Sequence, residues 1–154
     1  MIDAYSPSLR VINLASNAPS RVLYILEVSR NITSSWPSLG INQIGSLSYD
    51  EGYIIKMDYY GDGHNLYLEG SIIPSNVELV FEEGWSIISY LNPSPSSVEE
   101  TFSTIEDQLI IIKDEDGLIW WPSFGVNSME MMYPGKGYQI KMLNSTILQY
   151  PSLD

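Results

Sequence analysis

The chain has no cysteine and a single histidine among its 154 residues. The missing thiols exclude disulfides, zinc–thiolate sites, iron–sulfur clusters and thiol catalysis. A Ser-His-Asp triad would depend on His64, which lies in the turn-rich stretch 60–65. We expect this histidine to be structural or exposed, and we predict a protein without catalytic apparatus.

Basic residues are also scarce, since 7 Lys and Arg stand against 19 acidic residues and the net charge is −12. A nucleic-acid backbone would be repelled, so we expect no nucleic-acid partner. No run approaches 18 apolar residues, which predicts no membrane span, and residues 1–20 lack the pattern of a signal peptide. Apolar residues make up 44% of the chain, which is enough for a folded core.

Two segments match each other without a gap at an offset of 85 residues. Residues 36–57 read WPSLGINQIGSLSYDEGYIIKM, and residues 121–142 read WPSFGVNSMEMMYPGKGYQIKM. Ten of these 22 positions are identical, where chance would give about one or two. The match predicts two tandem modules, residues 1–75 and residues 76–154. The first module lacks the Gly-Trp pair that opens the second, so we expect its first strand to be truncated.

Each copy has a run of strand-forming residues upstream of its Trp-Pro pair, at 23–28 and at 109–112. Residues 84–90 have the pattern of a buried strand, and residues 114–117 predict a tight hairpin turn. We therefore predict a mainly β fold of antiparallel strands, a minor α+β type, in which the two copies are related by pseudo-twofold symmetry.

One short helix is expected in each copy. In the second copy, serine before two glutamates is typical of an N-cap, and apolar residues follow at helical spacing, which predicts a helix over 97–106. The first copy has a weaker version of this pattern, with Val11, Leu14 and Ala15.

The second copy resembles a repeat of cell-surface and virion-associated proteins of marine bacteria and their phages. The resemblance is carried by Gly84-Trp85, Trp121-Pro122 and the Gly135-to-Tyr138 segment, and it covers about two thirds of the first copy as well. It implies an extracellular or virion accessory module, and it supplies no catalytic residues to transfer.

Two acidic loops are candidate sites for a hard cation such as calcium, which favours clustered oxygen ligands. Asp58 and Asp62 lie near His64, and Asp114 and Asp116 lie in the expected hairpin turn. Neither loop matches the twelve-residue calcium loop, and turn chemistry explains both of them. We expect no cofactor, with calcium as the alternative.

Pairs of adjacent acids occur at 50–51, 82–83 and 99–100. A glycoside hydrolase needs two carboxylates that face each other across a cleft, but adjacent residues on a strand point to opposite faces. We interpret the pairs as solvated surface.

The four tryptophans are the best functional hint, because exposed aromatic rings bind sugars and protein partners. Trp36, Trp85 and Trp121 occupy repeated or strand positions, so we expect them in the core. Trp120 should face the opposite way from Trp121, which makes it the tryptophan we expect to be exposed and a candidate ligand contact.

Asn42 and Asn127 end the repeated segment, and two interpretations of them are open. In the first, the segment is a structural lock, with both asparagines mostly buried and bonded to local backbone in equivalent ways. Trp121→Ala would then cost about 3–5 kcal/mol, as a large core truncation does. In the second, the two amides point outward as twin ligand contacts.

Three functions follow, in order of preference. The first is a non-enzymatic structural or adhesion module of a virion or cell surface, whose partners are other protein subunits, further copies of the same chain among them, or a glycan surface. The second is a carbohydrate-binding module that uses exposed aromatics. The third is a hydrolase that uses carboxylates.

Overall fold

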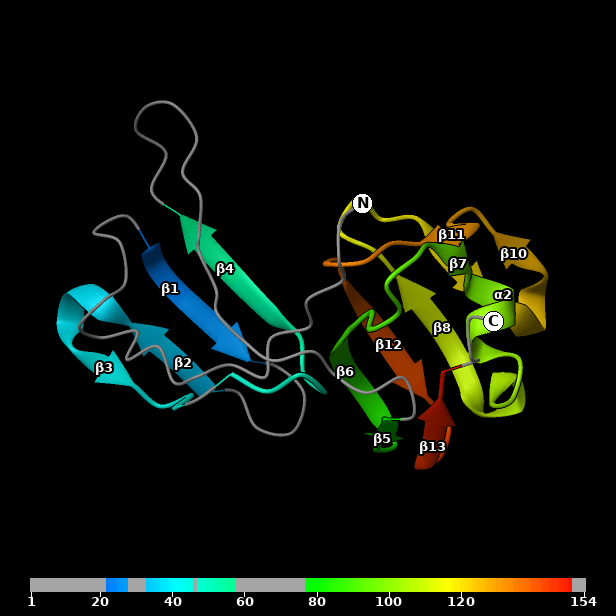
Figure 1. Cartoon of the computed structure of the whole chain (residues 1–154), viewed down its shortest axis with the longest axis horizontal. Helices are drawn as coiled ribbons and strands as arrows, with labels where there is room; N and C mark the ends of the chain where they lie inside the picture. Colours follow the sequence, from blue (N-terminus) through cyan, green and yellow to red (C-terminus); the bar gives the residue numbers. More distant parts are fainter. Residues whose placement is uncertain (1–21, 28–32, 46, 58–76, 151–154) are drawn as a thin grey trace.

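The computed structural model describes residues 22–27, 33–45, 47–57 and 77–150 (Figure 1). All of the strand pairs within these ranges are antiparallel. The predicted mainly β, antiparallel fold class is therefore confirmed. The helix expected near residues 11–15 lies outside the described residues.

The first half of the chain forms a four-stranded sheet, drawn in blue, cyan and blue-green in Figure 1. Its strand order is β3-β2-β1-β4. The bounds are β1 Val22–Glu27, β2 Thr33–Trp36, β3 Ile41–Asn42 and β4 Tyr53–Met57, and the 3-10 helix η1, Pro37–Leu39, joins β2 to β3.

The second half builds the same strand order and extends it by one strand. Its five-stranded sheet has the order β10-β9-β8-β12-β6. The bounds are β6 Gly84–Ser89, β8 Leu109–Lys113, β9 Ile119–Trp121, β10 Val126–Asn127 and β12 Gly137–Met142, with η3, Pro122–Phe124, between β9 and β10. Two further pairs are β5 Glu78–Phe81 with β13 Thr146–Gln149, and β7 Ser96–Ser97 with β11 Met131–Met132.

The pairing register of the two sheets agrees in detail. Ile25 pairs with Ser35 and Ile55 in the first sheet, as Ile112 pairs with Trp120 and Ile140 in the second. A bulge interrupts the β1–β4 ladder between the pairs made by Lys56 and Met57, and a bulge interrupts the β8–β12 ladder between the pairs made by the matching Lys141 and Met142. These shared details support the tandem-repeat interpretation, while the pseudo-twofold relation between the copies stays a prediction.

The predicted hairpin turn lies between β8 and β9. Asp114 closes it, because its Oδ1 accepts hydrogen bonds from the backbone N–H groups of Asp116 (3.0 Å) and Leu118 (2.8 Å). Gly117 takes the left-handed conformation, with φ of 83°, that a turn of this kind favours. The sequence prediction is confirmed here.

The helix of the second copy, α2, spans Val98–Phe102 and is shorter than the predicted 97–106. Its start is as expected, since the Ser97 side chain accepts a hydrogen bond from the N–H of Glu100. It ends early because Ser103 closes the last turn: its hydroxyl and its N–H both donate to the carbonyl of Glu100. A separate 3-10 turn, η2 Glu106–Gln108, leads into β8.

The core of the second half lies between one face of the five-stranded sheet and α2. Ile112, Tyr138 and Ile140 alternate onto this inner face and are at most 1% exposed. Val98 and Phe102 of α2 meet them and are fully buried. Burial of such side chains contributes roughly 1.5–3 kcal/mol each.

The two halves are joined at the outer edge of β6. The N–H of Gly52 donates to the carbonyl of Ile87 at 2.8 Å. The hydroxyl of Ser89 lies 2.9 Å from the carbonyl of Tyr49 and 3.0 Å from that of Glu51. The segment 49–52, which precedes β4, therefore covers the β6 edge, and we call this contact the β6 clasp.

Candidate functional site

The two Trp-Pro segments form the same turn. Trp36 and Trp121 have backbone angles of −123°, 86° and −128°, 87°, and the following proline opens a 3-10 helix in each copy. Proline suits this place because its φ is fixed near the helical value and it has no N–H to satisfy. Gly40 and Gly125 then end the helices in the left-handed conformation.

Asn42 and Asn127 close these turns in equivalent ways. Their Oδ1 atoms accept hydrogen bonds from the N–H three residues on, that of Gly45 at 3.0 Å and that of Glu130 at 2.9 Å. The predicted bonding to local backbone is therefore confirmed, but the predicted burial is wrong, because both asparagines are only half-buried. The reason is that each lies on a two-residue edge strand.

The amide nitrogens of the two asparagines do not match. Asn127 donates to the carboxylate of Glu99 at 3.1 Å, whereas Asn42 lies 3.4 Å from the carbonyl of Gly45. Because both oxygens bond to backbone and the two nitrogens have different partners, these amides are not arranged as twin ligand contacts.

Both turns expose large apolar side chains beside an exposed serine. Leu39 and Phe124 occupy matching positions and are 67% and 70% exposed. Ile41 and Val126, also matching, are both 41% exposed. Neither 36–48 nor 118–129 contains a charged residue. We call the two apolar surfaces the tips, consisting of Trp36, Leu39 and Ile41 in the first copy and of Trp121, Phe124 and Val126 in the second.

The second tip is held together by its aromatic rings. Trp121 is half-buried, and its ring meets that of Phe124 edge to face at a centroid distance of 4.4 Å. Edge-to-face pairs of this kind fix the relative orientation of the two rings. The contact with Trp121 therefore orients the exposed ring of Phe124, although no core lies beneath it.

The predictions for Trp120 and Trp85 are wrong. Trp120 is 4% exposed, and its ring packs 6.4 Å from that of Phe102. Trp85 is 49% exposed. Trp120 and Trp121 do alternate, but α2 covers the face that carries Trp120, whereas Trp85 lies on the opposite face of edge strand β6.

Trp85 has two lysines as neighbours. Lys141 lies directly opposite it on β12, with its Nζ 5.7 Å from the ring centroid. Lys113 reaches the ring from β8, at 5.5 Å. Both distances are within the range of cation–π attraction. Sequence reasoning missed this group. Its signal is that three residues on three different strands share one face of the sheet, which depends on the order of the strands.

The candidate calcium ligands of the hairpin turn have other roles. Asp114 closes the turn, and the Lys136 ammonium lies 3.0 Å from Glu115 and 4.0 Å from Asp116. The hydrogen bond to Glu115 raises the pKa of Lys136. Within the described ranges no cluster of three or more acidic or histidine side chains could hold a metal ion. Asp58, Asp62 and His64 lie outside the described residues.

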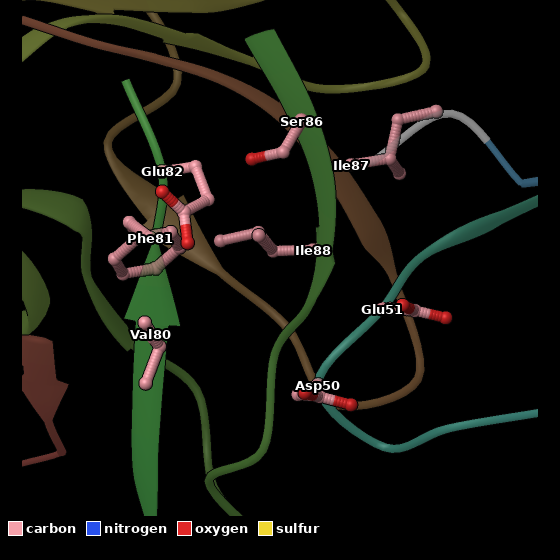
Figure 2. A pocket seen from close by; sticks show the side chains of 8 residues that line it. All are labelled: Asp50, Glu51, Val80, Phe81, Glu82, Ser86, Ile87 and Ile88. Atoms are coloured by element: carbon pink, nitrogen blue, oxygen red, sulfur yellow. The ribbon is translucent and has the colours of Figure 1, made fainter. Parts of the chain in front are cut away.

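A small hollow lies beside the β6 clasp (Figure 2). Its volume of about 20 Å³ is the space of one water molecule. The buried hydroxyl of Ser86, which has no protein partner, opens onto it.

The three acids of this hollow do not form a facing pair. Figure 2 shows Glu82 on one side of β6 and Asp50 and Glu51 on the other. Each accepts a hydrogen bond from a hydroxyl group, Glu82 from Ser145, Asp50 from Ser48 and Glu51 from Tyr53. The arrangement suits a joint between two units better than a catalytic cleft, which needs opposed carboxylates.

Searches against protein-family models, curated proteins and solved structures each gave no match. No helix among the described residues is long and apolar enough to span a bilayer. The roles of the site residues therefore rest on their geometry alone.

Proposed function

We propose that this protein is a non-enzymatic structural module that assembles with further copies of itself through its two tips, on a cell surface or virion. The observation that carries the proposal is the matching exposure of Leu39 and Phe124 on two equivalently locked turns. The cell-surface or virion setting follows from the sequence resemblance.

Exposure of apolar side chains at both tips has no local explanation. The turn requires the proline, the glycine and the asparagine, but not an apolar residue at the position of Leu39 and Phe124. Each of these side chains would gain roughly 1.5–3 kcal/mol if a partner surface covered it. Aromatic residues such as Phe124 and Trp121 are also enriched at the centres of protein interfaces.

The uncharged tips are compatible with a second copy as the partner, although the net charge of the chain opposes self-association. A chain with a net charge of −12 repels its own kind. The tips lie in stretches without charged residues, so contact through them brings fewer carboxylates together than contact through the acidic segments would. Two tips on one chain would let each copy contact two neighbours, which is the geometry of an extended array.

The test is sedimentation velocity at about 0.15 M and about 1 M NaCl. The protein concentration is varied from about 5 to about 500 μM, because weak contacts of this size associate in that range. We expect association that rises with concentration and with salt, because salt screens the repulsion and leaves the apolar contact. The double variant Leu39→Ser, Phe124→Ser should stay monomeric while its free energy of unfolding falls by no more than the about 0.5–1.5 kcal/mol of the Trp121–Phe124 ring contact, because both side chains are exposed.

A matched control is Val80→Ser with Ile147→Ser, a cross-strand pair on β5 and β13 that is 51% and 52% exposed. This control should associate like the parent. A parent that stays monomeric under all conditions, or a control that loses association as the tip variant does, would overturn the proposal.

A further inference from the structure

We propose that Trp85, Lys113 and Lys141 form a binding site for an acidic saccharide, and we call this group the Trp85 platform. The site lies on the outer face of the five-stranded sheet, opposite the core. It is independent of the tips and of the assembly that they mediate.

The platform is built by strand register. Trp85 on β6 pairs with Lys141 on β12, and Lys141 pairs with Ile111 on β8. Residues that pair across strands share a face of the sheet, and so do residues two apart along one strand. Lys113 therefore lies on the same face as Ile111, and this is also the face of Lys141 and Trp85. Three adjacent strands thus bring one indole ring and two ammonium groups together.

The charge of the platform is exceptional for this chain. Only seven residues are basic, and two of them lie within 6 Å of one ring centroid. Ion pairs with carboxylates within the described ranges involve Lys136, not these two lysines. Two ammonium groups that converge on one ring repel each other, and an anion between them would relieve this repulsion.

The exposed ring determines the class of anion. Trp85 is 49% exposed, so part of the indole remains open beside the lysines. An indole offers a flat apolar body, on which the C–H face of a sugar ring stacks, and the carboxylate or sulfate of an acidic sugar would then reach the ammonium groups. A saccharide with about one charge per ring also suits an acidic protein better than a nucleic-acid double helix, which carries one charge per about 1.7 Å of its axis.

The same geometry has a structural explanation, in which the aliphatic lysine stems shield the indole and bind nothing. An experiment has to separate these two roles. Saccharide binding depends on the charge of the ligand, whereas shielding of the ring does not.

The probe is a tetrasaccharide of galacturonic acid, titrated into the full chain at about 0.15 M NaCl and followed by calorimetry and by the indole N–H signals in NMR spectra. The fully methyl-esterified tetrasaccharide is the neutral control. We expect the acidic form to bind with Kd of about 1 mM, shifting the Trp85 indole signal, and the ester to bind at least about tenfold more weakly.

Variants assign the binding to the platform. Trp85→Ala and the double variant Lys113→Gln, Lys141→Gln should each weaken binding by about tenfold. Lys56→Gln is the matched control, because Lys56 is exposed at the position of the first copy that corresponds to Lys141. This control should bind like the parent.

Three results would overturn the proposal. The first is no binding of the acidic tetrasaccharide up to about 10 mM, tenfold above the expected Kd. The second is equal binding of the acidic form and the ester, or an equal loss in Lys56→Gln. The third is tighter binding of adenosine monophosphate than of the tetrasaccharide, which would make the platform a nucleotide site.

Discussion

Gly52 and Gly137 occupy the same position of the two copies, yet the structure predicts opposite responses to alanine at these sites. A Cβ atom on Gly52 would lie 2.3 Å from Cγ2 of Ile87, 2.9 Å from its carbonyl carbon and 3.0 Å from the nitrogen of Ile88. Two of these three atoms belong to the β6 backbone and cannot rotate away. A Cβ on Gly137 would meet its nearest atom, the carbonyl oxygen of Ile88, at 3.7 Å, an ordinary contact.

The cost of Gly52→Ala follows from the β6 clasp. The segment 49–52 would have to move off β6. The hydrogen bond from Gly52 to Ile87 would be lost or weakened, and so would the bond in which the single Ser89 hydroxyl proton is shared between the carbonyls of Tyr49 and Glu51. At about 1 kcal/mol for each of these two bonds, together with about 1–3 kcal/mol for the overpacked Cβ and some relief by water, the free energy of unfolding should fall by about 2–4 kcal/mol. Gly137→Ala should change it by less than about 1 kcal/mol, because alanine suits a strand better than glycine.

Urea unfolding monitored by tryptophan fluorescence measures both variants against the parent. In a thermal scan the loss for Gly52→Ala corresponds to a decrease in Tm of about 5–12 °C. Hydrogen exchange should also show the amides of 49–52 and of β6 opening more often. If the two glycine variants differ by less than about 0.5 kcal/mol, the β6 clasp does not join the halves as described.

Three further predictions concern the backbone, the core and pH. Glu130 has φ of 56° and its counterpart Gly45 has φ of 74°, a left-handed conformation that favours glycine. Glu130→Gly should therefore stabilise the fold by about 0.5–1 kcal/mol, and Gly45→Ala should destabilise it by about 1–2 kcal/mol. The midpoints of urea unfolding measure both changes. Trp120→Ala should cost about 3–5 kcal/mol and Trp85→Ala less than about 1 kcal/mol, and equal losses in denaturation curves would contradict the burial of Trp120 and the exposure of Trp85. Burial raises the pKa of Tyr150, so the unfolded chain releases this phenolic proton near pH 10 while the folded chain retains it. The stabilisation from this group is complete below pH 10 and is lost as the pH rises further, so the decline in urea midpoint between about pH 9 and about pH 11.5 should be smaller in Tyr150→Phe.

The sequence predicted those features that depend on local chemistry. The turn at 114–117 follows from aspartate and glycine at its ends, and the start of α2 follows from Ser97. The asparagine bonds were predictable because a short amide side chain in a turn reaches nearby backbone N–H groups. The antiparallel β fold follows from short strand-forming runs separated by turn residues.

Features that depend on which layer covers which face could not be predicted. Alternation placed Trp120 and Trp121 on opposite faces, but only the position of α2 decides that Trp120 is the one in the core. Trp85 has the sequence environment of a buried strand, yet the face that carries it is uncovered beside Lys113 and Lys141. The Trp85 platform is a contact between three strands, and the sequence of no single strand specifies the order in which the strands pair.

The end of α2 at Phe102 was also beyond sequence reasoning. Helical spacing continues to Ile105, which is buried, but Ile105 reaches the core from a turn in which its N–H bonds to the carbonyl of Phe102. Either a helix or a turn can bury two residues that lie three apart in the sequence. The hydroxyl of Ser103 favours the turn, because it donates to the carbonyl of Glu100.

The proposal that the chain assembles through its tips is tested most directly by concentration-dependent NMR. Proton–nitrogen spectra at about 20 μM and about 500 μM protein bracket the weak affinities expected of contacts this small. The account predicts that signals from 36–42 and 121–127 shift or broaden at the higher concentration, while those of Val80 and Ile147 do not. Spectra that are identical at both concentrations, or changes centred away from both tips, would contradict it.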